Sequence, residues 1–162
     1  MALVLVIAYG NPLRSDDGVA HRVADGLEAK FSEDDVEIVR PQQLGPELAE
    51  SASRVRCVIF VDAAAAGSPG EIQIRELDLH ASANPPAFGH ALPPSTIVRL
   101  SEQLFGVRVH AISATVTGQN FEHGDELSNA VAEAVPVLSS RIEELIRREL
   151  KTVNSGTTKD TK

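Results

Sequence analysis

The chain has 162 residues, of which 43% are hydrophobic and 23% charged, so it is long enough for one domain with a hydrophobic core. Its formal net charge of -8 at pH 7 argues against nucleic acid or an anionic membrane as a partner, because both require a basic surface. The single cysteine, Cys57, excludes an internal disulfide.

The chain opens on a nearly continuous apolar run over residues 3–9, which is typical of a strand buried on both faces. This run is too short to cross a membrane, and it lacks the basic start and the cleavage site of a signal peptide. We therefore expect a cytoplasmic protein.

Strand and helix patterns alternate through the first half of the chain. From Asp17 onward, apolar residues recur four apart and predict a helix, as seen at Val19, Val23 and Leu27. Further patterns predict a strand at 36–39, a short helix at 46–50 and a buried strand at 57–61 that ends at Asp62.

The second half continues the alternation. The patterns predict a half-exposed edge strand at 72–77, a loop at 78–92, a helix from 93–95 to about 105, a strand within 107–116 and a helix at 127–150. Pro136 should kink or divide that last helix. Residues 151–162 are polar and without periodicity, so we expect a single domain over 1–150 and a disordered tail. This order predicts an α/β domain with a mainly parallel sheet between helix layers.

Three groups of candidate site residues follow strands of this sheet. Asp16 and Asp17 follow the first strand, Asp62 ends the third, and His90 lies in the loop after the fourth. Ligands of open α/β sheets bind beyond the carboxyl ends of the strands. Two carboxylates and an imidazole at that edge could bind a divalent transition metal.

Each candidate also has a simpler interpretation. Asp16, or Ser15 beside it, could cap the following helix. Asp62 could cap a helix or accept a loop hydrogen bond, and His90 could be an ordinary loop histidine. From residue types and spacing alone, these alternatives stay open.

Other types of site are not favoured. The chain has no G-x-G-x-x-G fingerprint, no Walker A lysine and no G-x-S-x-G motif. Cys57 is predicted to be a buried apolar residue. The remaining histidines lack metal-site spacing and are interpreted as solvated or packing residues: His21, His80, His110 and His123.

Four segments together resemble the [NiFe]-hydrogenase maturation proteases, over about residues 3–148. They are "GNPLRSDDGVA", "VIFVDAAAAGSPGEI", "FGHAL" and "FEHGDELS". The resemblance implies a twisted five-stranded sheet covered by helices. It also implies an endopeptidase that removes the C-terminal extension of a hydrogenase large-subunit precursor after nickel insertion.

In the family, an acid of the Asp-Asp pair, the acid of the third strand and the loop histidine are the metal ligands. The resemblance therefore implies that Asp17, Asp62 and His90 form the metal and catalytic site, and that Asp16 is structural. The nickel would be supplied by the precursor, and we expect a monomer that forms a transient complex with it. Two alternatives are a non-catalytic nickel carrier or chaperone with the same ligands, and a generic nucleotide-binding domain.

Overall fold

The computed structural model describes residues 2–79 and 92–157. Its five strands are β1 (Val4–Ala8), β2 (Val36–Val39), β3 (Cys57–Ala64), β4 (Ile72–Glu76) and β5 (His110–Thr117). Its helices are the 3-10 turn η1 (Ser15–Gly18), α1 (Val19–Glu28), α2 (Leu48–Ser53), α3 (Pro94–Phe105) and α4 (Asn129–Thr157).

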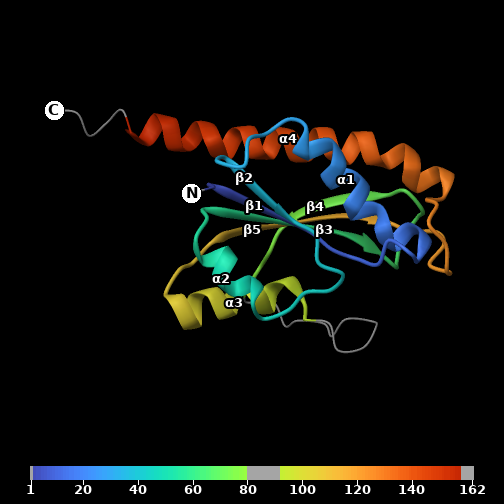
Figure 1. The fold of residues 1–162 in the computed structure, drawn as a ribbon, viewed down its shortest axis with the longest axis horizontal. Helices are drawn as coiled ribbons and strands as arrows, with labels where there is room; N and C mark the ends of the chain where they lie inside the picture. Colours follow the sequence, from blue (N-terminus) through green and yellow to red (C-terminus); the bar gives the residue numbers. More distant parts are fainter. Residues whose placement is uncertain (1, 80–91, 158–162) are drawn as a thin grey trace.

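The strands form one sheet in the order β2-β1-β3-β5-β4. Strands β2, β1, β3 and β5 are parallel to one another. Strand β4 pairs antiparallel with β5 at the edge of the sheet. Helices α1 and α4 cover one face, and α2 and α3 cover the other (Figure 1). The predicted three-layer α/β fold, with a mainly parallel sheet of five strands, is confirmed, and so is the edge position of the strand at 72–76.

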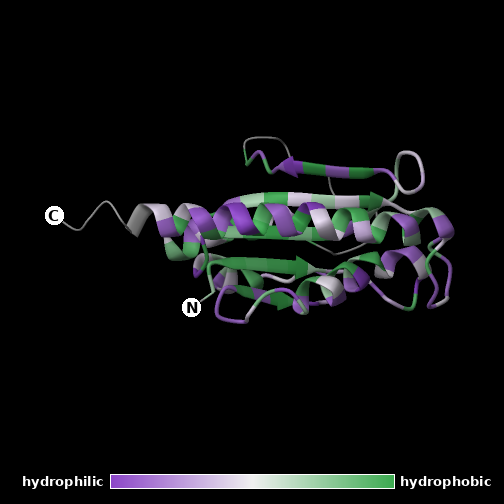
Figure 2. Cartoon of the chain, turned by 90° about the horizontal axis from the view of Figure 1, so that it is seen from above, coloured by the Kyte–Doolittle hydropathy of each residue, from purple (hydrophilic) through white to green (hydrophobic). Residues whose placement is uncertain are grey.

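The two faces of the central strands follow the alternation of their side chains. Val4, Val6 and Ala8 of β1 pack under α1 and α4, whereas Leu5 and Ile7 pack toward α2 and α3. All five are fully buried, and burying each of the larger ones contributes about 1.5–3 kcal/mol. In Figure 2 the central strands are mainly hydrophobic, whereas the edge strand β4 and the helix α4 mix hydrophobic and hydrophilic residues.

Strand β3 continues past Asp62, contrary to the prediction that it ends there. Asp62, Ala63 and Ala64 remain paired with Thr115, Val116 and Thr117 of β5. The apolar run ends at Val61, but the backbone ladder with the neighbouring strand carries the strand further. Hydropathy alone does not predict these hydrogen bonds between strands, so it places the end of the strand too early.

The beginning and end of two predicted helices also differ. The helix expected from Asp17 opens with the 3-10 turn η1, and α1 begins at Val19. Helix α4 runs to Thr157, so the prediction of a disordered tail from residue 151 is wrong as far as that residue. No glycine or proline follows Leu150 until Gly156, so nothing in the sequence stops the helix there. Pro136 lies inside α4 without dividing it.

Among residues 2–79 and 92–157, no helix combines the length and the apolar character needed to span a membrane.

Candidate active site

The turn after β1 brings the backbone close to Asp17. Gly10 has a φ of +139°, and a Cβ added to it would lie 2.1 Å from the Asp17 carbonyl oxygen, so only glycine fits there. The backbone N–H of Asn11 donates to Asp17 Oδ2 at 2.7 Å. The tight Gly10-Asn11 turn therefore fixes the carboxylate of Asp17, which is half-buried.

Asp62 lies just beyond the point where β1 leaves the sheet. The last pair between the two strands is Ala8 with Val61, and the Tyr9 N–H still donates to the Val61 carbonyl at 3.2 Å. Asp62 Oδ1 accepts from the Ala63 N–H at 2.7 Å, and the Tyr9 hydroxyl also donates to the Asp62 carboxylate. Asp62 thus lies at the carboxyl side of the switch point between β1 and β3, where the strand order reverses. Ligands of such sheets bind in a crevice at this position, and we refer to it here as the crevice between β1 and β3.

Asp17 and Asp62 interact electrostatically. Burial raises the pKa of Asp62 to about 7, and the negative charge of Asp17 adds to that rise against the hydrogen bonds from Ala63 and Tyr9. Burial and the same two carboxylates also raise the pKa of Tyr9 well above its ordinary value. The charge of Asp17 thus opposes the ionisation of Asp62, and a divalent cation close to both carboxylates would offset this effect. Carboxylate oxygens are among the ligands that such ions accept.

Asp16 has a different role from its neighbour. Its fully buried side chain accepts from the N–H groups of Gln119, Asn120 and Ser128 and from the Ser128 hydroxyl, all at 2.8–2.9 Å. Burial alone would raise the pKa of Asp16, but these hydrogen bonds lower it below the ordinary value. Asp16 is the structural acid that the family resemblance implied.

The helix-cap interpretation of Asp16 is wrong, because the side chain caps neither η1 nor α1. It instead holds a segment more than a hundred residues away, immediately before α4. Ser15 strengthens the same junction: its N–H donates to the Gly124 carbonyl at 2.8 Å, and its hydroxyl donates to the Glu122 carbonyl at 2.8 Å. The motifs "GNPLRSDDGVA" and "FEHGDELS" are thus packed against each other.

The third predicted ligand, His90, lies outside the described residues. The structure therefore relates Asp17 to Asp62 but leaves the position of His90 a prediction. Helix α3, which begins at Pro94 shortly after it, packs on the same face of the sheet as Tyr9.

Sequence reasoning overlooked two contributors to this site. Tyr9 directly follows the first strand, so its position next to the crevice could have been inferred from that strand. The segment "FEHGDELS" carries part of the family resemblance, but nothing in the sequence indicated that residues 118–128 would bind Asp16.

The architecture is shared with several solved structures. It is similar to the hydrogenase maturating endopeptidase HybD from E. coli, with a TM-score of 0.69 and 19% identity over 90% of this chain and 92% of that one. For the [NiFe] hydrogenase maturation protease HycI from Thermococcus kodakarensis, the TM-score is 0.72 and the identity 20%, over 89% of this chain and 92% of that one. For HybD from the same organism the values are 0.68 and 22%, over 88% and 98%.

No protein-family model and no curated protein sequence matches the chain. At these levels of identity, the similarity to solved structures establishes the fold. The chain therefore has the fold of the solved hydrogenase maturation endopeptidases across nearly its full length.

Proposed function

We propose that this protein is an endopeptidase that removes the C-terminal extension from a [NiFe]-hydrogenase large-subunit precursor after nickel insertion. The proposal is supported by the shared fold with proteins described as hydrogenase maturation proteases. The observation that carries it is the pair of carboxylates, Asp17 and Asp62, which interact at the crevice between β1 and β3.

The nickel ion belongs to the substrate in this proposal. Asp17 and Asp62, together with His90, would contact the nickel that the precursor already carries, and so bring its scissile bond to the crevice. Carboxylate and imidazole are suitable ligands for such an ion. An empty precursor would offer no ion to these residues, so cleavage would depend on nickel insertion. Either carboxylate can also accept a proton from an attacking water.

The local structure supports a division of labour between the two adjacent acids. The Asp16 carboxylate accepts hydrogen bonds from three backbone N–H groups and one hydroxyl. Within the part of the chain that the structure describes, the Asp17 carboxylate accepts from one backbone N–H, that of Asn11. A carboxylate with free acceptor capacity can take a ligand without breaking the fold. Asp17 is therefore the member of the pair assigned to the substrate.

The test is to mix the purified protein with a nickel-loaded large-subunit precursor and to follow the length of the large subunit. We expect a shortened product with the wild type and none with Asp17→Ala, Asp62→Ala or His90→Ala. Asp34→Ala, which changes an exposed acid outside the motifs of the site, is the matched control and should process normally. Stable association without shortening would instead identify a non-catalytic module that docks on the precursor.

A further inference from the structure

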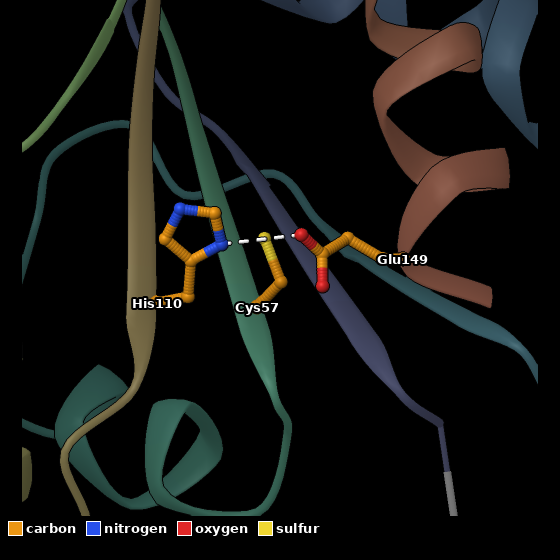
Figure 3. A group of neighbouring side chains, drawn as sticks. All are labelled: Cys57, His110 and Glu149. Carbon is orange, nitrogen blue, oxygen red and sulfur yellow. Dashed lines mark hydrogen bonds and ion pairs between the residues drawn. The ribbon is translucent and has the colours of Figure 1, made fainter. Parts of the chain in front are cut away.

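A second group of potential metal ligands lies at the amino ends of the parallel strands, opposite the Asp17–Asp62 crevice. Cys57 is the first residue of β3, His110 is the first residue of β5, and the two are directly paired in the parallel register. Glu149 reaches them from α4, which covers this face. Figure 3 shows the three side chains pointing toward one another from the two strands and the helix.

The spacing of these groups is close to that of a metal site. One potential ligand atom from each residue lies within 4.8 Å of the other two, and His110 Nδ1 is 3.1 Å from Glu149 Oε1. Ligands around tetrahedral zinc are separated by about 3.3 Å for nitrogen and oxygen and by about 3.6 Å for sulfur and nitrogen, given the usual bond lengths. Side-chain shifts of about 1 Å would therefore complete the geometry.

Glu76 supplies the partner that a metal-bound histidine usually has. Its Oε1 lies 3.0 Å from His110 Nε2, on the side of the ring away from Glu149. A carboxylate at one ring nitrogen fixes the proton there and leaves the other nitrogen free to bind a metal. The ring thus has one carboxylate at each nitrogen, Glu76 at Nε2 and Glu149 at Nδ1, and a cation at Nδ1 would be shared between the ring and Glu149.

The charge of the cluster also favours a cation. We call Cys57, His110, Glu149 and Glu76 the amino-edge cluster. Burial raises the pKa of the Cys57 thiol to about 12, and the charges of Glu149 and Glu76 contribute to that rise. The same negative surroundings would stabilise a divalent ion. Cys57 is fully buried, but His110 and Glu149 keep 41% and 24% of their side chains exposed, so an ion can enter from that side.

We propose that the amino-edge cluster binds a zinc ion through the Cys57 thiolate, His110 Nδ1 and the Glu149 carboxylate, with Glu76 holding the imidazole. A thiolate with an imidazole and a carboxylate suits zinc and excludes the hard ions magnesium and calcium. Binding forms the S–Zn, N–Zn and O–Zn bonds, and it releases the thiol proton and any proton on Nδ1 to solvent. A water would complete the four-coordinate shell.

The consequence of such a site is structural. Cys57 and His110 belong to two neighbouring strands, and Glu149 belongs to the last third of α4. An ion shared among them would fasten this part of α4 to the sheet. The proposal uses none of the residues at the Asp17–Asp62 crevice, so it stands or fails independently of the proposed protease function.

Cobalt(II) is the probe for the test, because it replaces zinc and gives a thiolate-to-metal charge-transfer band when sulfur binds it. Cys57 is the only cysteine of the chain, so this band reports the amino-edge cluster and no other site. Using the full chain without an affinity tag, we expect one equivalent of cobalt to produce the band and zinc to abolish it by displacement. Cys57→Ser should show no band.

The variant Glu76→Gln tests whether the cluster binds a metal or is only a group of neighbouring side chains. Its side chain is 79% exposed, so the variant should fold, yet it should weaken cobalt binding by about 10- to 100-fold. Glu144→Gln and His123→Ala change exposed residues of the same types and should leave the affinity unchanged.

Thermal unfolding provides a second measurement. Zinc at about one hundred times its Kd should raise the Tm of the wild type by about 5 °C or more, and should raise that of Cys57→Ser much less. Cobalt binding to the wild type without the thiolate band, or equal zinc shifts in the wild type and Cys57→Ser, would overturn the proposal.

Discussion

The two ends of β3 carry two different kinds of chemistry. At its carboxyl end, Asp62 interacts with Asp17 and Tyr9, so the described polar groups there are two carboxylates and a hydroxyl. At its amino end, Cys57 meets the imidazole of His110 and the carboxylate of Glu149. The comparison teaches that a parallel sheet gathers residues at both edges, because equivalent positions of neighbouring strands lie side by side at each end.

The two ends also differ in what holds their residues. The Asp17–Asp62 crevice is built by a glycine turn and by the departure of β1 from the sheet. The amino-edge cluster is built by direct strand pairing and by one residue of a long helix. Because different contacts hold the two groups of residues, we expect that a substitution at one end of β3 leaves the function of the other end unchanged.

The largest expected effect is loss of processing at the carboxyl end alone. Asp17→Asn and Asp62→Asn should slow cleavage of a nickel-loaded precursor by at least about 100-fold, equivalent to about 2.7 kcal/mol, because each removes a charged ligand. Cys57→Ser should cleave at the wild-type rate. The measurement is the rate at which the shortened large subunit appears, and an equal loss in a folded Cys57→Ser would contradict the separation of the two ends.

The next effect concerns the acid beside the crevice. Asp16→Ala should lower the free energy of unfolding by about 3 kcal/mol or more, because it leaves three backbone N–H groups and a hydroxyl without their buried charged acceptor. Urea unfolding measures the change, and Asp17→Ala is the control, with an expected loss below about 1 kcal/mol. Equal losses in the two variants would show that the acids are not divided between structure and substrate.

A smaller effect is expected at the tyrosine of the crevice. Tyr9→Phe removes the hydroxyl that donates to Asp62 and should lower the free energy of unfolding by about 1 kcal/mol. The measurement is again urea unfolding. Because Phe keeps the ring that packs toward α2 and α3, a loss of several kcal/mol would mean that packing of the ring, not the hydrogen bond, dominates.

For the last variant, Asp62→Asn, we expect no effect on metal binding at the amino-edge cluster. Asp62→Asn should keep the cobalt–thiolate band of the amino-edge cluster at wild-type intensity and affinity, since Asp62 lies at the other end of the strand from Cys57. Absorbance titration of the two proteins side by side checks this. Loss of the band in a folded Asp62→Asn protein would mean that the two ends are coupled through β3.

The amino-acid sequence was sufficient to predict the class of fold and the order of its elements. Apolar runs identified the buried strands, and the four-residue spacing of Val19, Val23 and Leu27 identified α1. These signals are local, since hydropathy and periodicity reflect which face of an element is buried. The sequence also directed attention to Asp17 and Asp62 through their places after apolar runs, while the role of His90 stays a prediction.

Tertiary structure alone decided which distant groups meet. It extended β3 past Asp62 by pairing it with β5, gave Asp16 its partners in segment 118–128, and brought Cys57, His110 and Glu149 together. From the sequence, Cys57 is interpreted as a buried apolar residue because it lies in an apolar run. His110 is interpreted as a solvated or packing residue because it lacks metal-site spacing. The physical reason is that strand register and the packing of α4 are set by the whole core, so no local pattern records which side chains they place in contact.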